Sequence, residues 1–290
     1  MESTANDLPP ENLDERHAVL VEAWRNSPAF SVKIDTYFQV YANLFGHLRG
    51  TNCTFIECGV LGGGSLFMWR EWLGKEARII GVDLNPGATK WASHGFEIFI
   101  GDQGDPIFWD NLFKQVGPFD ALLDDGGHQS FQQVVTLNAA VLAAENDCVI
   151  AIEDTGTSFF KDFKTHGKYS FLSYAKSCTD LLLKPYLSMV PGRTRKLKIA
   201  PELNIFHKIH KIEFYGGVVA FHVNQNQAVT AKLMSNMAPE KIPDFRYGGV
   251  KSARILWPTL FKHKVVKLRG GATILRRLKV DVLAKKLLRR

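Results

Sequence analysis

The sequence predicts an α/β fold: a mostly parallel, seven-stranded sheet closed by an antiparallel hairpin. Short apolar runs bounded by turn residues, which are typical of buried strands, occur five times and alternate with stretches of helical periodicity. Such alternation produces a parallel sheet with right-handed crossovers. A later apolar run, residues 212–221, divides into two strand-like halves around Gly216 and Gly217, which predicts the hairpin.

The elements can be placed in chain order. Apolar residues at helical spacing predict an amphipathic helix over residues 34–49. The expected parallel strands are 54–58, 78–82, 97–100, 119–123 and 148–152. The expected helices between and after them are 66–72, 107–115, 129–144 and 171–183.

Length and composition limit the number of domains that the chain can form. The 290 residues are 46% hydrophobic, enough for one large core with appendages. We expect a loosely held leader over residues 1–33, a folded domain over 34–223 and a basic extension over 224–290. The four cysteines fit no zinc spacing and read as reduced, buried residues. The polar N-terminus resembles no signal peptide, and no apolar run is long enough to span a bilayer, so we expect a soluble, cytoplasmic protein.

The charge is distributed unevenly. Residues 251–290 contain 13 Lys and Arg and one acid, whereas the other 250 residues contain 23 basic and 28 acidic side chains. This tail is interpreted either as a solvated basic helix or as a segment that docks at the inner membrane face on anionic lipid. Binding of nucleic acid through the tail is a weaker alternative, because the body lacks an excess of basic residues. The oligomeric state is open, and a homo-oligomer is compatible with the sequence.

Two acidic clusters follow predicted strands. Asp124 and Asp125, with His128 close behind, come after the fourth strand, and Glu153 and Asp154 after the fifth. Carboxyl ends of parallel strands meet at one edge of a sheet, where open α/β folds bind ligands. Carboxylates that converge there favour a cation with oxygen ligands such as Mg²⁺.

The same clusters have a purely structural alternative. Asp-Asp-Gly-Gly is a common turn sequence, and an Asp there can cap the helix expected from residue 129. Two clusters at adjacent strand ends, one of them with a histidine that can act as a base, favour a functional site.

Turns after the first three strands suggest a nucleotide-like ligand. The first strand ends in a glycine-rich segment in which the backbone can approach a ligand closely, although the spacing is not that of a dinucleotide site. Asp83 ends the second strand, where an acid can accept hydrogen bonds from ribose hydroxyls. Asp102 and Gln103 follow the third, where an acid can face an adenine amino group. The succession of these turns is more specific than any one of them.

These motifs resemble those of a known family. Glu57, Gly59, Gly63 and Ser65 match the S-adenosylmethionine loop of Rossmann-like class I methyltransferases. With Asp102, Gln103 and the cluster Asp124 to His128, the chain resembles more narrowly the macrocin and mycinamicin type of sugar O-methyltransferase, also labelled cephalosporin-hydroxylase-like. The likeness covers about residues 34–223, which would then form the methyltransferase domain.

The resemblance implies roles for the acidic clusters. Asp125, Glu153 and Asp154 would hold Mg²⁺, and His128 would be the catalytic base. The cofactor S-adenosyl-L-methionine would be bound by residues after the first three strands: Glu57, Gly59, Gly63, Ser65, Asp83, Asp102 and Gln103. Thr155 and Gly156 depart from the bulkier residues of relatives, which leaves the acceptor pocket undefined.

The expected function is O-methylation of a sugar hydroxyl in a glycan, a nucleotide sugar or a glycosylated natural product, for example in polysaccharide biosynthesis. Methylation of a catechol-like small molecule is the first alternative, since a vicinal diol can chelate the same ion.

Overall fold

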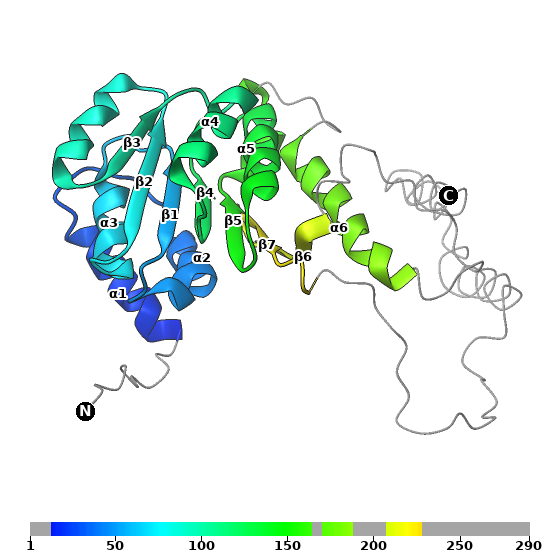
Figure 1. The fold of residues 1–290 in the computed structure, drawn as a ribbon. Coiled ribbons are helices and arrows are strands. Elements are labelled where there is room, and N and C mark those ends of the chain that lie inside the picture. Colours follow the sequence, from blue (N-terminus) through cyan, green and yellow to red (C-terminus); the bar gives the residue numbers. More distant parts are fainter. Residues whose placement is uncertain (1–12, 164–169, 188–206, 228–290) are drawn as a thin grey trace, which may run out of the picture. The chain divides into compact units, whose positions relative to one another are not determined.

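The sheet has the order β3-β2-β1-β4-β5-β7-β6 (Figure 1). The computed structural model describes residues 13–163, 170–187 and 207–227. The first five strands pair in parallel. They are β1 (Thr54–Cys58), β2 (Arg78–Asp83), β3 (Glu97–Ile100), β4 (Ala121–Asp124) and β5 (Cys148–Ile152). The hairpin of β6 (Ile209–Phe214) and β7 (Val219–Val223) adds to β5 in antiparallel orientation. This confirms the predicted seven-stranded sheet, mostly parallel and closed by an antiparallel hairpin.

The described helices after α1 follow the predicted order with small shifts at their ends, whereas α1 lies in the expected leader and was not predicted. They are α1 (Leu13–Arg25), α2 (Asp35–Phe45), α3 (Gly64–Leu73), α4 (Pro106–Val116), α5 (Ser130–Ala143) and α6 (Phe171–Leu187). Short 3₁₀ segments are η1 (Gly46–Leu48), η2 (Pro86–His94), η3 (Thr155–Phe159) and η4 (Lys161–Phe163). None of the described helices is long and apolar enough to cross a membrane.

Apolar side chains cover both faces of the sheet. Phe55 and Ile56 are neighbours in β1 and are fully buried in two different clusters, because successive strand residues point to opposite faces. The first cluster packs α1, α2 and α3 against the sheet, and the second packs α4, α5 and α6 (Figure 1). A sheet buried on both sides has continuous apolar strands, as the sequence shows.

The described part of the expected leader is integrated into the fold. In α1, Leu20 is fully buried and Ala23 is 5% exposed, and both belong to the cluster that contains α2 and α3. Beyond α1, the Ser27 hydroxyl donates to the carbonyl of Gly64, and Phe30 forms a parallel bridge with Gly63. The described residues 13–33 are therefore integrated into the fold, which differs from the loose leader expected over 1–33; residues 1–12 lie outside the described part.

The strand order determines where a ligand can bind. β1 lies between β2 and β4 in the sheet. The chain adds β2 and β3 on one side of β1 and then crosses to its other side, where it adds β4 and β5. The strand order therefore reverses between β1 and β4, and open α/β folds bind ligands beside such a point, at the carboxyl ends of the strands. All of the predicted site residues lie at that edge.

Candidate functional site

One cavity of about 530 Å³ spans the carboxyl ends of β1 to β5. Its wall includes residues from every predicted motif, so the structure brings the acidic clusters and the glycine-rich turn to a single site. The predicted residues that line it are Gly59, Asp83, Asp102, Gln103, Asp125, His128, Glu153 and Asp154.

At one end of the cavity, Asp83 organises the turn after β1. Its Oδ2 accepts hydrogen bonds from the backbone N–H groups of Val60, at 2.9 Å, and Leu61, at 3.0 Å. Its Oδ1 accepts one from the N–H of Asn85 at 2.7 Å. The carboxylate is thus fixed in orientation at the cavity wall, while Oδ1, which accepts only one of these bonds, keeps a further lone pair for a ligand hydroxyl.

Three of the predicted cofactor-binding residues support the turn from behind. Glu57 is fully buried, and its Oε2 accepts a hydrogen bond of 2.6 Å from the Ser65 hydroxyl. Gly63 lies against the indole of Trp91 with a φ of 83°. None of Glu57, Gly63 and Ser65 is among the residues that line the cavity. Their placement suits shaping of the turn rather than direct contact with a ligand.

The loop after β3 connects the two ends of the site. Asp102 is exposed at the cavity wall. Gln103 is 6% exposed; its amide donates to both carboxylate oxygens of Asp124, at 2.9 and 3.1 Å, and its Oε1 accepts from the N–H of Gly127 at 2.6 Å. The side chain of Gln103 therefore holds the acidic loop after β4.

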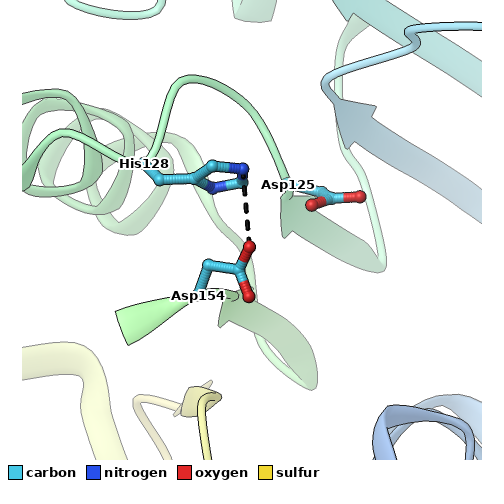
Figure 2. A group of neighbouring side chains, drawn as sticks. All are labelled: Asp125, His128 and Asp154. Carbon is cyan, nitrogen blue, oxygen red and sulfur yellow. Dashed lines mark ion pairs between the residues drawn. The ribbon is translucent and has the colours of Figure 1, made fainter. Parts of the chain in front are cut away.

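At the other end, Asp125, His128 and Asp154 converge (Figure 2). Each offers one ligand atom, and these atoms lie within 4.8 Å of one another. The Nε2 of His128 lies 3.5 Å from Oδ2 of Asp154. His128 and Asp154 have positive φ angles of 54° and 50°, which non-glycine residues rarely adopt and which are concentrated at functional sites.

Neither acid of the first cluster acts as a helix cap. Gln129 caps α5, and its backbone N–H bonds the side chain of Gln132 in a capping box. Asp124 accepts the amide of Gln103 and the N–H of Gly126, so it fixes the turn. Asp125 is left to face the cavity. A purely structural role in the turn therefore applies to Asp124 but not to Asp125.

Glu153 lies in the same wall but is 1% exposed. The Tyr41 hydroxyl donates a short hydrogen bond to its Oε1, and the ammonium of Lys33 lies 3.8 Å from the same oxygen. Burial raises the pKa of the Glu153 carboxyl well above its ordinary value, and the charge of Lys33 opposes this shift. Glu153 therefore lies outside the group of three and is held from the side of α2.

Lys33 is a site residue that the sequence did not indicate. Its Nζ lies 2.5 Å from Asp125 Oδ2 and 3.3 Å from Glu57 Oε1, and its side chain is 2% exposed. Burial by itself would lower the pKa of Lys33, but the charges of Glu153, Asp125 and Glu57 outweigh it and raise the pKa, so the ammonium is charged. A lysine in an expected leader carries no periodic signal that would reveal this contact.

The donor set suits a hard divalent cation. Carboxylate oxygens of Asp125 and Asp154 converge, and Mg²⁺ is typically held by one or two carboxylates. One feature of the free protein also fits a cation: the Lys33 ammonium lies among three carboxylates, those of Glu57, Asp125 and Glu153, whose negative charges exceed its single positive charge.

Comparisons with known proteins agree with the resemblance seen in the sequence. No family model matches the chain. The demethylmacrocin O-methyltransferase of Streptomyces fradiae is 26% identical over 212 residues, 67% of this chain and 50% of the relative. The mycinamicin VI 2''-O-methyltransferase of Micromonospora griseorubida is 30% identical over 134 residues, 42% of this chain and 32% of the relative. A tetracenomycin-C rhamnosyl 2'-O-methyltransferase of Streptomyces olivaceus is 28% identical over 45% of this chain and 36% of the relative.

A solved structure supports the fold. The MycE methyltransferase from the mycinamycin pathway, in complex with Mg and SAH, superposes with a TM-score of 0.58 at 22% identity, over 73% of this chain and 55% of MycE. The chain spans about half or less of the length of these curated relatives. The resemblance to macrocin- and mycinamicin-type sugar O-methyltransferases is thus confirmed by sequence, and the class I methyltransferase fold by structure.

Proposed function

We propose that this protein is an S-adenosylmethionine- and Mg²⁺-dependent O-methyltransferase that acts on a sugar hydroxyl. The observation that carries the proposal is a single cavity with a glycine-rich turn and Asp83 at one end and the group of Asp125, His128 and Asp154 at the other. A cofactor bound along the turn would face an acceptor bound at the acidic end. The relatives are O-methyltransferases of a rhamnosyl tetracenomycin-C, of demethylmacrocin and of mycinamicin VI, and their activities support the same reaction.

The cofactor end of the cavity suits an adenosyl group. Gly59, with a φ of 97°, lets the backbone pass along the cavity without a side chain, and Asp83 and Asp102 present carboxylates beside it. Asp83 would accept hydrogen bonds from ribose hydroxyls, and Asp102 would face the adenine amino group. Glu57, Gly63, Ser65 and Gln103 would contribute by maintaining the shape of the surrounding loops.

The metal ligands are proposed to be Asp125, Glu153 and Asp154. Asp125 and Asp154 already converge, and Glu153 lines the same cavity. When bound, Mg²⁺ would stabilise negative charge that develops on the acceptor oxygen, and S-adenosylmethionine would supply an activated methyl group.

The protein's own residues would align the acceptor and move its proton. A sugar hydroxyl is a weak nucleophile at neutral pH, so a base beside it lowers the barrier to attack. We assign this role to His128, which would accept the proton at Nε2. Asp154 would stabilise the resulting imidazolium, because its Oδ2 lies 3.5 Å from that atom. The walls of the cavity would hold oxygen, methyl carbon and sulfur in line.

A competition assay tests the choice of acceptor. The full chain would be incubated with methyl-labelled S-adenosylmethionine and Mg²⁺ in the presence of nucleotide sugars, glycosylated polyketides and catechols. We expect label in a sugar methyl ether. Label found only in catechols would show that the acceptor is a catechol-like small molecule and not a sugar. No label in either class of acceptor would contradict both proposed acceptors.

Peripheral membrane contact through residues 251–290 is a separate proposal, which rests on 13 basic residues against one acid. These residues lie outside the part of the chain that the structure describes. An anionic bilayer would attract such a segment, and a membrane-bound enzyme would have access to a lipid-linked glycan.

A further inference from the structure

Three polar side chains at a spacing of four residues point from one segment toward the acidic end of the cavity. Lys33 precedes α2, and Tyr37 and Tyr41 lie on its first and second turns. Residues four apart on a helix lie on the same face, so both tyrosines present their hydroxyls in the same direction. The sequence identified these tyrosines only as part of an apolar stripe, and most of their rings are indeed buried in the core.

Tyr37 fixes one carboxylate of the site. Its hydroxyl donates a hydrogen bond of 2.8 Å to Oδ1 of Asp154. The other oxygen of this carboxylate, Oδ2, is the atom that faces His128. A donor on Oδ1 therefore sets the rotation of the carboxylate and leaves Oδ2 available to the histidine or to a cation.

Tyr41 and Lys33 fix the remaining acids. The Tyr41 hydroxyl and the Lys33 ammonium both contact Oε1 of Glu153. Lys33 also contacts Asp125 at 2.5 Å. Tyr41 is fully buried and does not line the cavity, whereas Lys33 lines it with a side chain that is only 2% exposed. Both side chains contact the carboxylates.

We propose that Lys33, Tyr37 and Tyr41 are positioning residues for the divalent-cation site, each orienting one or more of the carboxylates Asp125, Glu153 and Asp154. The inference rests on the metal site of the proposed function and extends it to residues outside the acidic clusters. In this arrangement Lys33 is a permanent internal cation that keeps the acids together before the ion binds. The tyrosines select which carboxylate oxygens face the cavity.

The variant Tyr37→Phe tests the proposal most cleanly, since it removes one hydroxyl and keeps the ring in the core. Titration of the full chain with Mg²⁺, followed by calorimetry, would measure affinity without any turnover. Residues that orient metal ligands typically contribute 10- to 100-fold to metal affinity, so we expect a loss of about tenfold or more. Affinity for S-adenosylmethionine should change less than twofold.

Tyr215→Phe is the matched control. Its phenol also donates to a carboxylate, that of Glu213, but it lies at the end of β6 and does not line the cavity. Wild-type Mg²⁺ affinity is expected for this variant. Equal affinity in wild type, Tyr37→Phe and Tyr215→Phe would overturn the positioning role while leaving the metal site intact. Absence of Mg²⁺ binding in the wild type would overturn both.

The variant Lys33→Met tests whether Lys33 acts as an internal cation, and the measured quantity is the Tm. Without Lys33 the acids lack a counter-charge, so the variant should have a lower Tm than wild type in the absence of divalent ions. Mg²⁺ should raise the Tm of this variant more than that of wild type, because the ion replaces the missing charge. A Tm equal to that of wild type without Mg²⁺ would overturn the role assigned to Lys33.

Discussion

Gly59 and Asp125 pack backbone against backbone: a Cβ added to Gly59 would lie 2.1 Å from the carbonyl oxygen of Asp125. The contact joins the turn after β1 to the acidic loop after β4. The N–H of Asp125 also donates to the carbonyl of Cys58 at 2.8 Å. The proposed cofactor and cation ends therefore share a wall, and a change in one loop displaces the other.

This contact predicts a strong effect of Gly59→Ala. The new methyl group would clash with backbone rather than with a flexible side chain, and the residue would keep a φ of 97°. We expect a loss of on the order of 2 kcal/mol in the free energy of unfolding, together with weaker cofactor binding. Gly50→Ala is the control, because Gly50 also has a positive φ, 72°, but has nothing within 4 Å of its added Cβ. Equal denaturant midpoints for the two variants would contradict the clash.

Asp83→Ala should weaken S-adenosylmethionine binding about tenfold to hundredfold, the loss expected for hydrogen bonds to a charged group worth roughly 1.5–3 kcal/mol. Calorimetry would measure the affinity. Because Asp83 also supports the N–H groups of Val60 and Leu61, Asp83→Asn should be compared, since the amide keeps one acceptor oxygen. Unchanged affinity of Asp83→Ala for S-adenosylmethionine would show that Asp83 does not bind the ribose hydroxyls.

Removal of divalent ions should abolish turnover, and added Mg²⁺ should restore it. Asp154→Ala should have the same effect as a chelator, because Asp154 contributes to the group of three and also contacts His128. The assay is methyl transfer with and without excess chelator. Full activity of the wild type in chelator, or of Asp154→Ala, would show that these acids have only a structural role.

His128→Ala should lower turnover by about 10²–10⁴, the usual contribution of a general base. Affinity for S-adenosylmethionine should change little, because His128 lies at the acidic end of the cavity. Single-turnover rates and cofactor affinity would be measured side by side. A wild-type rate would exclude His128 as the base.

The basic tail predicts binding to anionic vesicles. Each Lys or Arg near an anionic surface contributes about 1 kcal/mol, and the attraction is screened within about 8 Å at physiological salt. The full chain should co-sediment with phosphatidylserine vesicles at low salt, and a chain that ends at Asn224 should not, while still methylating a soluble acceptor. Equal sedimentation of the two chains would reject membrane docking.

The sheet and the location of the site could be predicted because both depend on local patterns. Apolar runs predicted the parallel strands. Asp83 ends β2, and Asp125 and Asp154 come just after β4 and β5, so topology alone brings the three acids to one edge of the sheet. The ends of β4 shifted by one to two residues, since Phe119 packs in the core without joining the strand.

Other roles depend on tertiary contacts that a single sequence does not encode locally. Glu57 matches a cofactor-binding motif, yet burial pairs it with Ser65 and Lys33. Tyr37 and Tyr41 have the spacing of residues on the core face of a helix, and their apolar rings suit that position. Tyrosine also has a polar hydroxyl, and only the packing of α2 on the sheet shows where these hydroxyls point.

Mass spectrometry of both products would test metal-dependent methyl transfer to a sugar oxygen. With S-adenosylmethionine, Mg²⁺ and a sugar acceptor, we predict one S-adenosylhomocysteine formed for each methyl ether on a sugar hydroxyl, and neither product in excess chelator. Methyl ether formation that continues at the same rate in chelator would exclude a required metal ion, and S-adenosylhomocysteine formed without any methylated sugar would exclude a sugar acceptor.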